Sequence, residues 1–296
     1  MSTKTLIYIA GPTGVGKTKL SIELAKALST EIISCDSRQF YREMNIGTAV
    51  PNNQELEQVP HHFIQHKSIN DIYTVGDFEK DAIIKLNELF CKKDNIIMVG
   101  GSGMYADAVM FGIDDFPEIS QETKNKIKIF YQTHGLKGIQ DLLLKKDPKY
   151  YNRVDINNPA RLIRALEVCI SSDQPYSSFL GKKRKPRNFI SKIIILSSPR
   201  NVLYDKINQR VDLMIKNGLE DEAKFLIKKK IPLKTVGYKE LFPYYEKSQT
   251  LENAVDEIKK NSRRYAKRQI TWFKKYKNAI RLSANISVID VFELLK

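Results

Sequence analysis

The residues with the clearest chemical meaning form a glycine-rich sequence near the start of the chain. Residues 11–18 read G-P-T-G-V-G-K-T, which matches the pattern G-x-x-x-x-G-K-[ST] at every defined position. In this pattern backbone N–H groups surround phosphate oxygens, the lysine adds a positive charge, and the last hydroxyl binds Mg²⁺. A glycine-rich turn without this chemistry is the alternative. We predict a di- or triphosphate site made of Gly11, Pro12, Thr13, Gly14, Val15, Gly16, Lys17 and Thr18, with Thr18 as the Mg²⁺ ligand.

A phosphate site that hydrolyses ATP needs a carboxylate at the end of a nearby apolar strand. The apolar run 96–99 ends in Gly100 and has no such acid. The comparable carboxylate is Asp36, which follows the apolar run 32–35 and precedes Ser37, Arg38 and Gln39. Ligands of open α/β sheets bind at the carboxyl ends of strands. We therefore place Asp36 in the candidate site; capping of a following helix is the alternative.

A second glycine-rich sequence, G-G-S-G-M-Y at 100–105, follows the apolar run 95–99. Its N–H groups and the Ser102 hydroxyl could approach the same phosphates, although an ordinary turn explains the glycines as well. Ser102 is therefore a candidate site residue.

The distribution of charge points to a polyanionic partner. The net charge is +15, and residues 1–150 carry 18 basic and 19 acidic residues, whereas residues 151–296 carry 31 and 15. Such asymmetry is typical of nucleic-acid-binding proteins, although lysine-rich helices also keep proteins soluble. Within 259–281 there are ten basic residues and no acidic one. There, basic residues alternate with aromatic ones that could stack on bases; a helix with solvated charges is the alternative.

The elements that must position these residues alternate between strands and helices. Short apolar runs at 5–10, 31–35, 61–64, 95–99 and 192–196 predict strands, and amphipathic patterns at 19–28 and 75–91 predict helices. This alternation is typical of an α/β fold with a parallel sheet flanked by helices. Residues 115–190 are predicted to be a helical insertion with helices at 121–133, 136–145 and 159–171. Residues 1–114 are predicted to form the first part of the core. Residues 191–296 are predicted to complete this core and to end in basic helices.

Composition excludes several classes of protein. No apolar run approaches the roughly 18 residues of a membrane span, and the first residues lack the features of a signal peptide. The cysteines, Cys35, Cys91 and Cys169, are isolated, which argues against disulfides and a zinc site and fits a reducing cytoplasm. We expect a cytoplasmic monomer that does not bind membranes.

Several motifs in order resemble the tRNA dimethylallyltransferases, also called tRNA isopentenylpyrophosphate transferases. The resemblance runs from Gly11 to about Trp272 and is to the bacterial type, which has no zinc finger. Besides residues 11–18, 36–39 and 100–105, it rests on N-P-A-R-L-I-R-A-L-E at 158–167, Q-R-V-D-x-M at 209–214, V-G-Y at 236–238 and K-R-Q-I-T-W at 267–272. The sequence departs from the family at Ala160, where glutamine is common, and at Ser102, where threonine is common.

The resemblance implies a fold similar to the P-loop NTPases and a specific reaction. The dimethylallyl group would pass from dimethylallyl diphosphate to N6 of adenosine 37 in tRNA, and diphosphate would leave. Lys17, Ser102 and Arg210 would act on the diphosphate, and Asp36 would be the general base. The resemblance implies contacts to the tRNA anticodon stem-loop from Asp36, Ser37, Arg38, Gln39, Ala160, Arg161, Leu162, Ile163, Arg164, Gly237, Tyr238, Arg263, Arg264, Lys267, Arg268 and Trp272.

Three other functions remain compatible with parts of the sequence. A prenyltransferase for free adenine nucleotides would share the phosphate loop and Asp36, but would not need the basic second half. A small-molecule or nucleoside kinase would fit the phosphate loop, but the absence of an acid at the end of the strand argues against a kinase. A nucleic-acid-binding protein with a regulatory nucleotide site would need no transferase chemistry.

Overall fold

A computed structural model describes residues 3–181, 185–229 and 235–295. The chain divides into two compact units, one made of Met1–Phe111 with Pro186–Lys296 and the other of Gly112–Lys185. The sequence suggested 115–190 for the insertion, but residues 186–190 belong to the first unit. Arg187 explains this difference, because its guanidinium donates to Glu79 Oε1 at 2.7 Å and to the backbone oxygens of Ala108 and Val109.

The first unit is built on a sheet of six parallel strands in the order β3-β2-β4-β1-β5-β6. The strands are β1 (Thr5–Ala10), β2 (Ile32–Ser34), β3 (His61–His62), β4 (Asn95–Val99), β5 (Ile190–Ser197) and β6 (Ile280–Ser283). The predicted α/β class with a parallel sheet is confirmed. Strand β6 was not predicted, because this edge strand has only two half-buried apolar residues, Ile280 and Leu282, to mark it.

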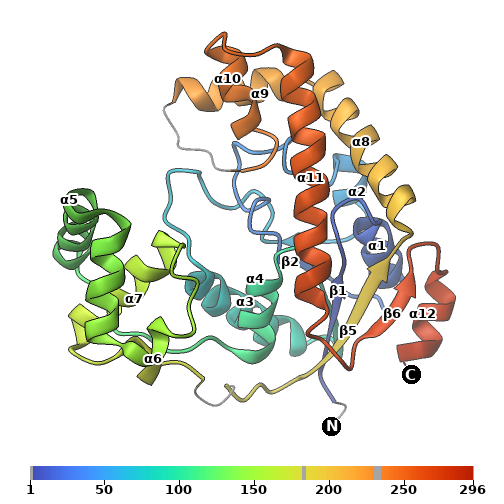
Figure 1. Cartoon of the computed structure of the whole chain (residues 1–296). Coiled ribbons are helices and arrows are strands. Elements are labelled where there is room, and N and C mark those ends of the chain that lie inside the picture. Colours follow the sequence, from blue (N-terminus) through green and yellow to red (C-terminus); the bar gives the residue numbers. More distant parts are fainter. Residues whose placement is uncertain (1–2, 182–184, 230–234, 296) are drawn as a thin grey trace. The chain divides into compact units, whose positions relative to one another are not determined.

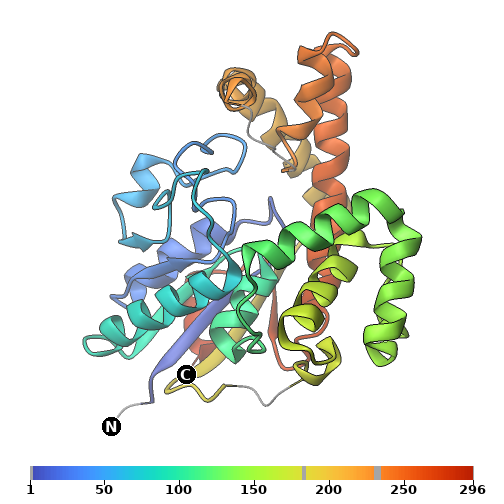
Figure 2. The same cartoon turned by 90° about the vertical axis from the view of Figure 1, so that its left-hand side faces the viewer.

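Helices cover both faces of this sheet (Figures 1 and 2). The side chains of β1 alternate between the two apolar cores: Leu6 and Tyr8 face one, and Ile7 and Ile9 face the other. Helices α3 (Val75–Phe90) and α4 (Gly103–Phe111) belong to the first core, and α1 (Lys17–Ala27) and α12 (Val288–Leu295) to the second. Strands buried on both faces explain the continuous apolar runs in the sequence.

A third core joins the remaining helices of this unit. It includes buried side chains of α8 (Arg200–Lys216), α9 (Leu219–Lys228) and α11 (Leu251–Phe273). The 23-residue helix α11 runs beside α8 and reaches down to the sheet, as Figure 1 shows. The short elements α2 (Asn53–Leu56), η2 (Lys239–Leu241) and α10 (Phe242–Tyr245) complete the unit.

The second unit is helical, and its core is formed by α5 (Gln121–Lys146) and α7 (Pro159–Ser172), with α6 (Pro148–Tyr151) and η1 (Tyr176–Ser178) beside them. Helix α5 is interrupted at Gly135, whose φ of 63° is left-handed. The two helices predicted at 121–133 and 136–145 are therefore the two halves of α5.

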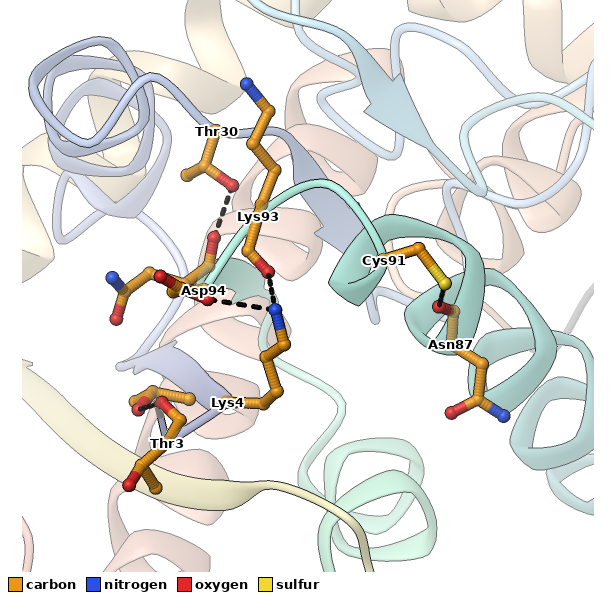
Figure 3. Close-up of polar contacts among 9 residues, drawn as sticks. Thr3, Lys4, Thr30, Asn87, Cys91, Lys93 and Asp94 are labelled. Carbon is orange, nitrogen blue, oxygen red and sulfur yellow. Dashed lines mark hydrogen bonds and ion pairs between the residues drawn. The ribbon is translucent and has the colours of Figure 1, made fainter. Parts of the chain in front are cut away.

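The amino ends of the strands are tied together by polar contacts, shown in Figure 3. Lys4 Nζ donates to the backbone oxygen of Lys93 at 3.1 Å and forms an ion pair with Asp94 at 2.8 Å. The Thr30 hydroxyl donates to the backbone oxygen of Asn95 at 2.5 Å. The polar residues predicted to do chemistry lie at the opposite, carboxyl-end edge. Within the described ranges, no helix is both long and apolar enough to cross a bilayer.

Candidate active site at the carboxyl ends of the strands

A cavity of about 380 Å³ opens where β1, β2 and β4 end. Its walls come from several parts of the first unit: the phosphate loop with α1, residues 34–39, residues 47–51, residues 61–64, residues 99–100, α8, residues 235–237 and α11. The predicted residues that line it are Thr13, Lys17, Thr18, Asp36, Ser37, Arg38, Gln39, Arg210, Gly237 and Arg268. The structure thus brings together residues more than 200 positions apart in the sequence.

The phosphate loop has the backbone that anion binding requires. Gly14 and Gly16 have φ values of 82° and 105°, a region that favours glycine. Gly16 precedes α1 and offers no side chain to its first turn, so the N–H groups there can take an anion. Lys17 Nζ donates to the backbone oxygen of Pro12 at 2.9 Å, which holds the ammonium beside the loop.

Burial lowers the pKa of Lys17 to about 8, although the nearby charge of Asp36 opposes this shift. Because burial disfavours the charged form of Lys17, a negatively charged ligand beside the ammonium would stabilise it. The cavity therefore favours a phosphate-bearing ligand electrostatically.

Asp36 lies in the same cavity, immediately after β2. Its carboxylate accepts the N–H of Arg38 at 3.2 Å and also the N–H of Gly101. Residues 37–40 form a turn, so Asp36 does not cap a helix. Burial raises the pKa of Asp36 above its usual value, while these N–H groups and the charge of Lys17 act against the shift. A half-buried carboxylate with a raised pKa is a candidate proton acceptor.

Ser102 connects the second glycine loop to the residues after Asp36. Its hydroxyl oxygen accepts the N–H of Ser37 at 3.1 Å and lies 3.1 Å from the Ser37 hydroxyl. Tyr265 of α11 also hydrogen-bonds Ser102, and burial together with Asp36 raises the pKa of Tyr265 to about 12. The tyrosine therefore stays a neutral phenol at the edge of the cavity.

The wall formed by residues 47–51 is fixed from two sides. Gln39 Nε2 donates to the backbone oxygens of Thr48 and Ala49 at 3.2 and 2.9 Å. Glu222 of α9 accepts the N–H groups of residues 45–47 and the Tyr238 hydroxyl, the latter at 2.7 Å. The side chain of Tyr238 is fully buried against Gly47, so it supports this wall and has no surface to offer RNA. Gly237 beside it lines the cavity.

The basic residues of α11 have different surroundings. Arg264, Lys267 and Arg268 are exposed, whereas Arg263 is half-buried and donates to Asn208 of α8 at 2.6 Å. Trp272 is 40% exposed, and Lys275 Nζ lies 3.8 Å from the centre of its ring. Arg263 therefore has a structural partner that the sequence did not reveal.

The predicted RNA contacts of 160–164 lie at the start of α7 in the second unit. Ala160, Arg161 and Arg164 are exposed and Ile163 is half-buried, but Leu162 is fully buried in the apolar core of that unit. Leu162 thus packs in the core, and the exposed face offers the two arginines. The sequence G-K-K-R-K-P at 181–186 also predicts a basic loop, but its residues 182–184 lie outside the described part of the chain.

Helix α11 contributes polar side chains to the site that were not among the predicted site residues. Tyr265 and Gln269 of α11 both line the cavity. The sequence does carry a signal for them, because residues 265, 269, 272 and 276 are spaced to share one face of a helix.

The oxygen donors around the cavity could hold a magnesium ion only if a bound phosphate ligand supplies further oxygen atoms. Among the described residues, no three His, Cys, Asp or Glu side chains cluster as a metal site. Thr18, the last residue of the phosphate loop, lines the cavity, and Asp36 is the one carboxylate among the described residues that line its walls. Mg²⁺ commonly keeps water ligands and is held by one or two protein groups together with substrate phosphates. The donor set fits an ion that arrives with a diphosphate.

The chain is similar to known proteins over most of its length. The family described as IPP transferase matches residues 39–276. A tRNA dimethylallyltransferase of Flavobacterium psychrophilum is 51% identical over 298 residues, covering 98% of this chain and 97% of that protein. One of Christiangramia forsetii is 54% identical over 272 residues, covering 91% and 90%.

Solved structures show the same likeness. The tRNA isopentenylpyrophosphate transferase of Bacillus halodurans is 37% identical, with a TM-score of 0.72 over 99% of this chain and 95% of its own. A eukaryotic dimethylallyltransferase, described as acting on tRNA, is 26% identical, with a TM-score of 0.82 over 95% and 74%. The matched lengths include both compact units.

Proposed function

Because the chain belongs to the IPP transferase family, we propose that it transfers the dimethylallyl group of dimethylallyl diphosphate to N6 of adenosine 37 in tRNA. The observation that carries this proposal is one cavity that is lined by the phosphate loop and the carboxylate of Asp36, while Gly100 and not an acid follows β4. This arrangement suits a diphosphate that leaves and an amine that loses a proton. It does not provide the strand-end acid of ATP hydrolysis.

The phosphate loop stabilises the leaving group in this reaction. The bond between the allylic carbon and the diphosphate oxygen breaks, and the diphosphate leaves with the electron pair. N–H groups of residues 14–18, the Lys17 ammonium and the Arg210 guanidinium provide positive potential where this charge develops. Such electrostatic stabilisation often contributes more to catalysis than any other effect. Thr18 would hold Mg²⁺ together with the diphosphate, and the ion would supply further charge neutralisation.

Asp36 acts on the nucleophile. As the new bond forms between N6 and the allylic carbon, the amine must lose one proton, and the Asp36 carboxylate accepts it. The N–H groups of Arg38 and Gly101 hold that carboxylate in place. Ser37, Arg38 and Gln39 line the same wall and would contact the adenine, which must leave its stack to enter the cavity.

The exposed basic face of α11 supports a tRNA-binding role for this helix. Arg264, Lys267 and Arg268 lie on the helix that also carries Tyr265 and Gln269 into the cavity. RNA held on this face would have a nucleotide near the cavity mouth. Arg161 and Arg164 of α7 offer a second basic surface. The proposal also includes a monomeric state and a cytoplasmic location.

The double substitution Arg264→Ala and Lys267→Ala tests this surface. Each phosphate contact releases counterions, so the salt dependence of tRNA affinity should become shallower by about 0.7–0.9 per lost contact in a log–log plot. Arg263→Ala is the matched control, because its guanidinium is held by Asn208 and should change the slope less. Affinity is measured from low to moderate salt. Equal slopes for the double variant and the wild type would remove α11 from the RNA interface.

One assay separates the proposed function from its alternatives. Labelled dimethylallyl diphosphate is offered with unmodified tRNA, AMP or ATP, and we expect label in tRNA alone. Label in AMP or ATP would identify a nucleotide prenyltransferase. Rapid ATP hydrolysis or phosphoryl transfer without prenyl transfer would favour a kinase and contradict the proposal.

A further inference from the structure

Gln269 occupies an unusual place in the helix that carries the basic face. It is a polar residue of α11, yet only 5% of its surface is exposed. It lies between the phosphate loop and the second glycine loop, 256 residues from one partner and 168 from the other along the chain. The mechanism above does not use it.

Both ends of its amide are engaged. Oε1 accepts the N–H of Thr13 at 2.8 Å, and Nε2 donates to the backbone oxygen of Gly101 at 3.0 Å. A buried amide whose donor and acceptor are both satisfied can fix two backbones rigidly, whereas losing it leaves two polar groups without partners. Gln269 therefore bridges the loop that holds phosphate and the loop that follows β4.

The second loop is also the one that orients Asp36. The N–H of Gly101 donates to the Asp36 carboxylate, while its backbone oxygen accepts from Gln269. The approach is so close that a Cβ on Gly101 would lie 2.1 Å from Gln269 Nε2. The next atoms it would meet are at 3.4 Å, in the same glutamine, and at 3.9 Å, in Asp36. Only the glutamine side chain makes this position intolerant of a methyl group.

We propose that Gln269 is a positioning residue that fixes the distance between the phosphate loop and Asp36 by holding Thr13 and Gly101 at once. Its amide acts on the backbones of the two loops. The inference rests on the proposed function for its meaning in catalysis, but the bridge itself can be tested by ligand binding alone. A displacement of about 1 Å between reacting groups can cost on the order of 10²-fold in rate.

The test is a double-mutant cycle of Gln269→Ala and Gly101→Ala. Each single variant should lower kcat/KM for the diphosphate donor about 10²-fold, the second because its methyl group displaces the glutamine amide. In the Gln269→Ala background that clash is gone, so Gly101→Ala should add little. Multiplied losses in the double variant would show that the two residues act independently and would overturn the proposal.

A second variant separates positioning from folding. Gln269→Met fills the volume but makes neither hydrogen bond, and it should lose activity like Gln269→Ala. Phe273→Leu is the control, because Phe273 lies one turn further on α11, is buried in an apolar core and lines no part of the cavity. Thermal melts show that each variant is folded at the assay temperature. Kinetic constants of Gln269→Met equal to those of the control would refute the proposal.

Two binding measurements complete the design. Inorganic pyrophosphate should bind Gln269→Met more weakly than the wild type, because the Thr13 backbone is no longer held, whereas tRNA affinity should stay unchanged. Weaker tRNA binding with unchanged pyrophosphate binding would instead make Gln269 an RNA contact and overturn the proposal. If the wild type transferred no prenyl group but the variant still bound pyrophosphate more weakly, the proposed function would fail and the bridge would stand.

Discussion

Lys17→Ala is expected to slow prenyl transfer severely, with a loss of about 10³-fold or more in kcat/KM for the donor. The Lys17 ammonium lines the cavity and is held next to the phosphate loop by the backbone oxygen of Pro12. Removing it takes away charge where the leaving diphosphate becomes more negative. The measurement is single-turnover transfer to unmodified tRNA at saturating tRNA.

Lys19→Ala provides the matched control for this substitution. Lys19 lies two residues further on α1, its side chain is 82% exposed, and it faces Glu23 at 3.9 Å. The control removes the same charge from the same helix without entering the cavity. Equal losses in the two variants would mean that Lys17 acts only through the overall charge of the protein, contrary to the proposed role.

The lowered pKa of Lys17 also predicts how donor capture depends on pH. In the free protein the ammonium loses its proton as the pH rises through about 8. Because the charged form binds the diphosphate, kcat/KM for the donor should fall above that pH. A bound diphosphate stabilises the ammonium, so the corresponding fall in kcat, the basic limb of its pH profile, should occur at a higher pH. The Lys17→Ala variant should lack this limb.

Local sequence was sufficient to predict the strands that are marked by a continuous apolar run. The runs 5–10 and 95–99 are buried on both faces of the sheet, and both strands begin and end where the sequence predicted. Strand β6 escaped prediction because an edge strand with two half-buried apolar residues resembles a loop. The pattern of the phosphate loop could be recognised because its glycines and lysine lie within eight adjacent residues, and its role as a phosphate site stays a prediction.

Residues whose role depends on distant partners could not be read in the same way. Arg263 looked like any other basic residue of α11 until its bond to Asn208 of α8 was seen. Tyr238 was implied to contact RNA, but its partner Glu222 and its close contact with Gly47 bury it. Gln269 bridges two loops that the sequence does not place together. Such roles arise from packing between elements, and the periodicity of a single sequence does not show which elements pack together.

Asp36→Asn is expected to reduce the rate of transfer by about 10²- to 10⁴-fold, the usual contribution of a general base. The amide keeps the shape of the side chain and an oxygen that can accept the N–H of Arg38, but it cannot take the proton from N6. Affinity for tRNA should therefore change little. The rate is measured under single-turnover conditions, together with tRNA binding at one fixed salt concentration.

The pH profile distinguishes a base from a structural aspartate. Burial raises the pKa of Asp36, so the carboxylate becomes protonated at a higher pH than an exposed aspartate would. In the wild type, activity should fall as the pH drops through that raised pKa, and Asp36→Asn should lose this acid limb. Asp94→Asn is the matched control, because Asp94 pairs with Lys4 at the amino ends of the strands, away from the cavity (Figure 3). If Asp36→Asn kept nearly the wild-type rate and its acid limb, the proton would have another acceptor and Asp36 would have only a structural role.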